Sequence, residues 1–140
     1  MTIQRLLNKV PRWTFTVIVV IAVLYLTLMP QPLPDNDIQW FEGADKVVHG
    51  IMMFGVMLCL SFDYFRIHYK QQDRTPGGIL SLFLILTIAF GGMIELVQDW
   101  MGLGRGKDIM DFEADTIGAL VAYVIVLLNW HHLRQWVLKH

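Results

Sequence analysis

The chain has 140 residues, of which 55% are apolar and 16% are charged. A soluble domain averages about 45–50% apolar residues and about 25% charged residues, so this composition excludes a soluble globular protein of this length, and it equally excludes a disordered chain. The net charge of −1 argues against a nucleic-acid-binding protein, which needs a basic surface, and the single cysteine, Cys59, excludes an intrachain disulfide and a cysteine-based metal cluster.

Four apolar stretches predict an all-α membrane protein, a four-transmembrane-helix bundle that forms one domain over residues 1–140. A helix that spans a bilayer needs about 20 mostly apolar residues. We therefore expect helices at about residues 12–30, 45–65, 78–98 and 108–130.

The first predicted helix contains an uncharged run from Trp13 to Met29, preceded by a basic leader. A secretory signal peptide has a similar leader, but the residues after Met29 offer no small-residue cleavage site, so we interpret the segment as a retained helix. The other three stretches are shorter between charges. They reach spanning length only if the polar residues at one end belong to the helix.

The distribution of lysine and arginine predicts the orientation of the chain. Eight of the eleven lie in the N-terminal arm, in the loop between the second and third helices, and in the C-terminal tail. Because loops rich in lysine and arginine stay in the cytoplasm, we expect both termini to be cytoplasmic.

With this topology, polar residues of three helices converge at the outer face of the membrane. They are Asp45, Lys46 and His49 of the second helix, Glu95 and Gln98 of the third, and Asp108, Asp111 and Asp115 of the fourth. Spacings of three, four or seven residues place the members of each set on one helix face. Gly118 and Ala122 continue the last stripe with small residues, which indicates that it faces the bundle, whereas Glu113 lies off this stripe.

The predicted cluster is acidic, because six carboxylates at this face outnumber three cations, Lys46, Arg105 and Lys107. A purely anionic ligand is repelled there unless a carboxylate is protonated or a cation intervenes, and oxygen-rich sites suit hard divalent cations such as Mg²⁺ or Ca²⁺. Two plainer interpretations stay open. Asp45 and Asp108 each precede an apolar run as a helix N-cap does, and Arg105 is able to pair with a carboxylate in an internal salt-bridge network.

Three short motifs stand in order along the chain: Asp45-Lys46-x-x-His49, then Glu95-x-x-Gln98, then Arg105-x-x-Asp108-x-x-Asp111-x-x-x-Asp115-x-x-Gly118. Together they resemble the VanZ-like family of small bacterial membrane proteins, named for a teicoplanin-resistance protein. The resemblance implies an integral protein of the bacterial cytoplasmic (inner) membrane, a role in the cell envelope linked to glycopeptide resistance, and a site at the outer face. Two positions depart from the family pattern: Asp115 stands where the family usually has Asn, and Met53 where it often has Tyr.

Two functions fit these observations. The first is binding of, or action on, a lipid-linked or cell-wall ligand at the outer leaflet, with Glu95 or Asp111 as general base or metal ligand and His49 as proton shuttle. The other polar residues would then bind the ligand: Asp45, Lys46, Gln98, Arg105, Asp108 and Asp115. The second is a non-catalytic membrane module, in which the polar cluster holds the helices together and the chain binds a protein partner. A transporter is disfavoured because the chain has no inverted repeat.

Overall fold

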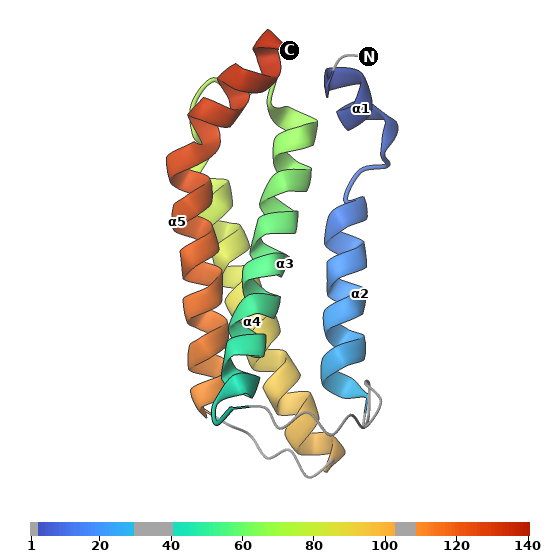
Figure 1. The fold of residues 1–140 in the computed structure, drawn as a ribbon, viewed down its shortest axis with the longest axis vertical. Coiled ribbons are helices and arrows are strands. Elements are labelled where there is room, and N and C mark those ends of the chain that lie inside the picture. The colour runs from blue at the N-terminus through green and yellow to red at the C-terminus, as the bar shows by residue number, and fades with distance from the viewer. Residues whose placement is uncertain (1–2, 30–40, 103–108) are drawn as a thin grey trace.

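The computed structural model describes residues 3–29, 41–102 and 109–140, and in these ranges the regular secondary structure is helical (Figure 1). A short helix precedes four long ones. Their bounds are α1 Ile3–Lys9, α2 Thr14–Leu28, α3 Ala44–His68, α4 Gly77–Met101 and α5 Ile109–Lys139. The predicted all-α class with four long helices is confirmed, and α1 is a helix that the apolar pattern did not predict.

The last helix runs to Lys139, well beyond its predicted end at about residue 130. No glycine or proline follows Trp130, and Val137 is buried against the apolar core. Arg134 also holds this segment, because its Nε donates a 2.7 Å hydrogen bond to the Tyr69 carbonyl. Contacts with the end of α3 therefore continue a helix that the sequence alone presented as a polar tail.

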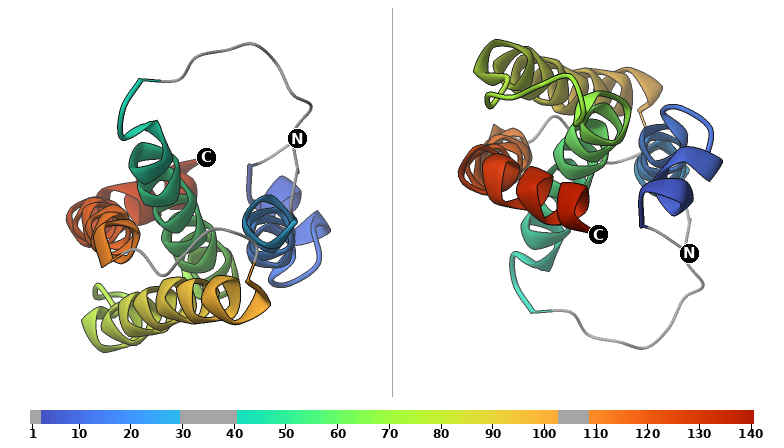
Figure 2. Two further views of the ribbon diagram at one scale, coloured as in Figure 1. Left: turned by 90° about the horizontal axis from the view of Figure 1, so that it is seen from below. Right: turned by 90° about the horizontal axis from the view of Figure 1, so that it is seen from above.

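The long helices form a bundle in which α3 is central. α3 contacts α2, α4 and α5, and α2 contacts α4 as well as α3, an arrangement that Figure 2 shows along the bundle axis. α1 and the C-terminal end of α5 lie at one end of the bundle, and the start of α3, the end of α4 and the start of α5 lie at the other (Figure 1). An aromatic core that includes Tyr64, Phe65 and Trp130 fills the first of these ends.

Among the described residues, two helices are long and apolar enough to cross a membrane, α3 and α4. Each has 25 residues, which at 1.5 Å per residue extend about 37 Å, more than the roughly 30 Å hydrocarbon core of a bilayer. Only 33% of the most apolar window of each helix is buried within the protein. Several large apolar side chains of these helices, among them Ile51, Ile85 and Met93, are more than 60% exposed, as those of a lipid-facing helix are. α2 is apolar but has only 15 residues.

A side chain of α3 caps the start of α2. Trp13, the residue before α2, has a left-handed backbone with φ 62° and its side chain makes no capping hydrogen bond. Asp63 of α3 supplies the cap instead, because its Oδ2 accepts 2.8 Å hydrogen bonds from both the backbone N–H and the hydroxyl of Thr16. Arg66 completes the arrangement: it donates to Asp63 Oδ1 at 2.7 Å and to the backbone carbonyl of Pro11 at 2.9 Å.

α3 and α5 approach each other closely at a pair of glycines near the polar end of the bundle. A Cβ atom at Gly118 would collide with the carbonyl of Gly50, and one at Gly50 would lie 3.3 Å from the Ala114 carbonyl oxygen. Gly118, Ala119 and Ala122 are all buried, which confirms that the small-residue stripe of the last helix faces the bundle. This contact brings the start of α5 against the start of α3, where the polar residues lie.

Candidate functional site

Three helices contribute buried polar side chains to one end of the bundle. His49 comes from the second turn of α3, Glu95 from the last two turns of α4, and Asp111 and Asp115 from the first two turns of α5. We call these four residues, together with Lys46 of α3, the polar cluster. The structure thus brings together five residues that lie up to 69 positions apart in the chain, as the motif order predicted.

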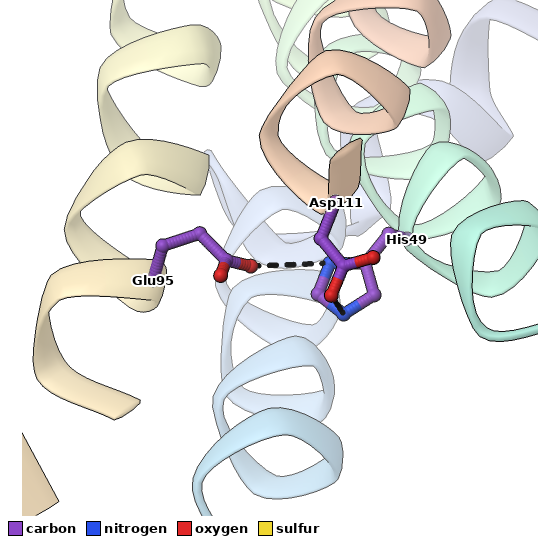
Figure 3. Close-up of side chains that lie close together, drawn as sticks. All are labelled: His49, Glu95 and Asp111. Atoms are coloured by element: carbon purple, nitrogen blue, oxygen red, sulfur yellow. Dashed lines mark ion pairs between the residues drawn. The ribbon is translucent and has the colours of Figure 1, made fainter. Parts of the chain in front are cut away.

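Three carboxylates surround the imidazole of His49. Asp115 Oδ1 lies 3.3 Å and Glu95 Oε1 lies 3.7 Å from Nδ1, while Asp111 Oδ2 lies 3.9 Å from Nε2. In Figure 3 the Glu95 carboxylate points from α4 toward the His49 ring, and the Asp111 side chain of α5 lies beside that ring. Both ring nitrogens therefore face carboxylate oxygens, and these contacts become ion pairs when the imidazole is protonated.

The three carboxylates of the cluster are buried, whereas Lys46 and His49 are half-buried. Glu95 is 3% exposed, Asp115 1% and Asp111 9%. A charged side chain set into hydrocarbon costs about 2.5–3.5 kcal/mol even on the lenient insertion scale, so three buried carboxylates require partners. Lys46 supplies one, since its Nζ lies 3.2 Å from Asp111 Oδ1. With a neutral imidazole, three carboxylates against one ammonium leave the cluster acidic.

The cluster contains the donor set of a metal site. His49, Glu95 and Asp111 each offer one ligand atom, and these atoms all lie within 4.8 Å of one another. Two carboxylates and an imidazole suit a divalent cation, with the carboxylate oxygens favouring a hard ion such as Mg²⁺ or Ca²⁺.

Gln98 lies apart from the imidazole. Its side-chain amide donates a 2.8 Å hydrogen bond to the backbone carbonyl of Thr27, in the last turn of α2. The carbonyls of a last helical turn have no partner within their own helix, so Gln98 satisfies one of them and joins α4 to α2. The sequence placed Gln98 among the ligand-binding residues, and its geometry in this structure is that of an inter-helix tie.

Of the three other residues predicted for the site, the structure describes one. Asp45 is exposed in the first turn of α3, and Arg105 and Asp108 fall outside the described residues. Glu113 is exposed, which agrees with its position off the buried stripe of the last helix.

A second buried polar group, the pair Asp63 and Arg66, was not predicted from the sequence. From the sequence, Arg66 was expected in the cationic loop after the second helix, and Asp63 had no predicted role. Both residues belong to α3, their side chains are buried, and they bond to the start of α2 and the residues before it. The signal was an acidic and a basic residue three positions apart at the end of an apolar run, a spacing that pairs them on one helix face.

Comparisons with known proteins agree with this architecture. The VanZ/LLP1 family matches residues 3–130. The chain is also 25% identical over 136 residues to a probable hexose phosphate transport protein of Chlamydia muridarum, an alignment that covers 96% of this chain and 28% of that protein. No solved structure matches the chain. The described part of the chain has four long helices, two of them able to span a bilayer, and a buried His/Glu/Asp cluster. The chain is therefore a membrane protein that belongs to the VanZ/LLP1 family.

Proposed function

We propose that this protein resides in the bacterial cytoplasmic membrane with both termini in the cytoplasm, and that its polar cluster binds the polar headgroup of a lipid-linked or cell-wall ligand at the outer leaflet. The observation that carries the proposal is the burial of three carboxylates around one imidazole at a single end of the bundle. Intramembrane ionisable groups are costly and mark functional sites by default. A role in glycopeptide resistance follows as the biological setting that the VanZ resemblance implies.

The headgroup that suits this cluster is cationic or carries a phosphate bridged by a metal ion. An acidic cluster repels a bare phosphate, but a divalent cation held by His49, Glu95 and Asp111 reverses the local charge and gives a phosphate oxygen a ligand position. Lys46, half-exposed beside Asp111, is placed to contact the same phosphate. The phosphate ester in the name of the Chlamydia relative has the same chemistry, although this chain aligns with only 28% of that protein.

The same groups are equipped for proton transfer. A carboxylate beside an imidazole is a common pair in general acid–base catalysis, and Glu95 and Asp111 each lie within 4 Å of His49. In an enzymatic form of the proposal, Glu95 or Asp111 acts as the base and His49 carries the proton away.

A second candidate function is a structural role for the cluster, with binding of a protein partner elsewhere on the chain. The Lys46–Asp111 contact favours it, because that pair joins α3 directly to α5. The two candidates differ in what removal of a carboxylate does: a ligand site loses its ligand and keeps its fold, whereas a structural cluster loses stability.

Native mass spectrometry of gently extracted protein separates them. We compare wild type with Glu95→Gln and Asp111→Asn, which remove charge and keep shape, and with Glu113→Gln, an exposed acid of α5 that serves as the matched control. We expect wild type and Glu113→Gln to retain a lipid-sized ligand, a divalent cation or both, and the two cluster variants to lose them with unchanged helicity and melting temperature.

The opposite result has a clear meaning. If wild type carries nothing and Glu95→Gln and Asp111→Asn melt at much lower temperature than Glu113→Gln, the cluster is structural. Susceptibility to teicoplanin of a sensitive host that expresses each variant then tests the resistance role separately.

A further inference from the structure

A lateral groove between α4 and α5 meets the polar cluster at Glu95. Its volume is about 580 Å³, within the range of small-molecule sites. Eight of its nine lining residues are apolar or glycine, and the ninth is Glu95. Because Glu95 Oε1 also lies 3.7 Å from His49, one residue belongs to both the groove and the polar cluster.

The groove faces outward along the part of the bundle that lies in hydrocarbon. Ile85 and Leu96 of α4 and Ile109 of α5, which line it, are 63%, 56% and 69% exposed. Gly92 forms part of its floor, where a Cβ atom would come within 3.2 Å of the Phe112 ring. In a membrane, a surface of this composition is covered by hydrocarbon chains rather than by water.

The length of the groove matches one leaflet. Its lining on α4 runs from Ile85 to Leu96, which at 1.5 Å per residue is about 16 Å, close to half of the roughly 30 Å hydrocarbon core. Glu95 lies six residues before the end of α4 at Met101, about 9 Å from that end. The polar end of the groove therefore lies near the boundary between headgroups and hydrocarbon, and its apolar end near the middle of the bilayer.

We infer that this groove binds the hydrocarbon chain of a membrane amphiphile whose headgroup contacts the polar cluster, so that the ligand enters sideways from the outer leaflet between α4 and α5. The inference rests on the proposed function, because it assumes that the cluster binds a headgroup. It adds the class of ligand, a molecule with a long hydrocarbon chain and a polar end, and the path by which that molecule arrives.

The test uses full-length protein in vesicles of phosphatidylethanolamine and phosphatidylglycerol that contain phosphatidylethanolamine with a photoreactive diazirine in one acyl chain. After illumination, adducts are mapped by peptide mass spectrometry. Ala89→Phe narrows the groove from α4, and Ile109→Trp narrows it from α5. Ala22→Phe places the same ring on an exposed position of α2, away from the groove, and is the matched control.

We expect adducts to concentrate on the groove segments of α4 and α5 relative to α2, and to fall about tenfold in both groove variants, equivalent to about 1.4 kcal/mol of binding, while Ala22→Phe labels as wild type does. Unchanged labelling in a folded Ala89→Phe or Ile109→Trp protein overturns the inference.

A Glu95→Gln arm separates this inference from the proposed function. If Glu95→Gln loses bound lipid and the groove variants do not, the headgroup site is supported. The inference that the groove binds the hydrocarbon chain is then refuted. Loss of labelling in the groove variants with full retention of lipid in Glu95→Gln shows a chain site unconnected to the cluster, which refutes both the inference and the proposed function.

Discussion

Two Asp–Arg pairs in this protein differ mainly in their burial. The side chains of Asp63 and Arg66 are almost fully buried, and a guanidinium nitrogen of Arg66 lies 2.7 Å from Asp63 Oδ1. Asp73 Oδ1 lies 2.5 Å from a guanidinium nitrogen of Arg134, but the Asp73 side chain is 85% exposed. Water screens an exposed pair, which contributes little. Removal of one partner of a buried pair leaves an uncompensated charge, and here it also removes the cap of α2.

We expect Asp63→Ala to lower the free energy of unfolding by about 3–5 kcal/mol, the cost of breaking a buried pair. Asp73→Ala, the same change in the exposed pair, should cost no more than about 1 kcal/mol. Unfolding of both variants in detergent, followed by circular dichroism, measures the difference. Equal losses would show that the contacts of Asp63 with Thr16 and Arg66 do not stabilise the start of α2.

Asp115 illustrates how one residue influences the tautomer of its neighbour, here His49. A carboxylate accepts hydrogen bonds and does not donate them, so Asp115 Oδ1 at 3.3 Å calls for a proton on His49 Nδ1. An Asn at this position would offer either a donor or an acceptor and would leave the tautomer open. Asp115 therefore leaves Nε2, on the Asp111 side, as the nitrogen available to a metal ion or a ligand.

At the scale of the element, the contact between α3 and α5 depends on glycine. Gly118 has no space for a side chain because the Gly50 carbonyl occupies it, whereas a Cβ atom at Gly55 would lie at an ordinary 3.7 Å from a Val19 methyl group. Close approach of backbones at small residues is a common way for membrane helices to associate. In this bundle it also sets the distance between His49 and the carboxylates of α5.

Gly118→Ala should therefore push α5 away from α3. We expect a loss of about 1–3 kcal/mol or more, as for other overpacked sites, together with loss of whatever the polar cluster binds. Gly55→Ala makes the same change on α3 and should leave both properties close to wild type. Melting temperature and native mass spectrometry of the two variants test this, and a Gly118→Ala protein with wild-type stability would contradict the close approach.

At the scale of the whole molecule, the two ends of the bundle differ in chemistry. The end that holds α1 and the end of α5 carries the aromatic core and the Asp63–Arg66 pair, and the opposite end carries the polar cluster. An even number of membrane crossings would put both termini on one side and the cluster on the other. The excess of lysine and arginine predicts that the termini are on the cytoplasmic side.

Reporter fusions test this orientation. Alkaline phosphatase, which is active only outside the cytoplasm, should be active when fused after Met101 and inactive when fused after Gln72 or His140. Green fluorescent protein, which fluoresces when it folds in the cytoplasm, should give the reverse pattern at the same three positions. An active phosphatase after His140 would place the polar cluster in the cytoplasm and remove the outer leaflet from the proposed function.

The sequence by itself determined the helical class, the approximate position of each long helix and the convergence of the five residues of the polar cluster, because hydrophobic runs and residue spacing act locally along the chain. His49, Glu95, Asp111 and Asp115 were predicted to converge and do so. Three features depended on the tertiary structure: the direction of Gln98 toward α2, the capping of α2 by Asp63, and the extension of α5 to Lys139. Each rests on a contact between residues more than 45 positions apart. Such contacts exist only once the helices have packed, and no local pattern encodes which backbone group a buried side chain will meet.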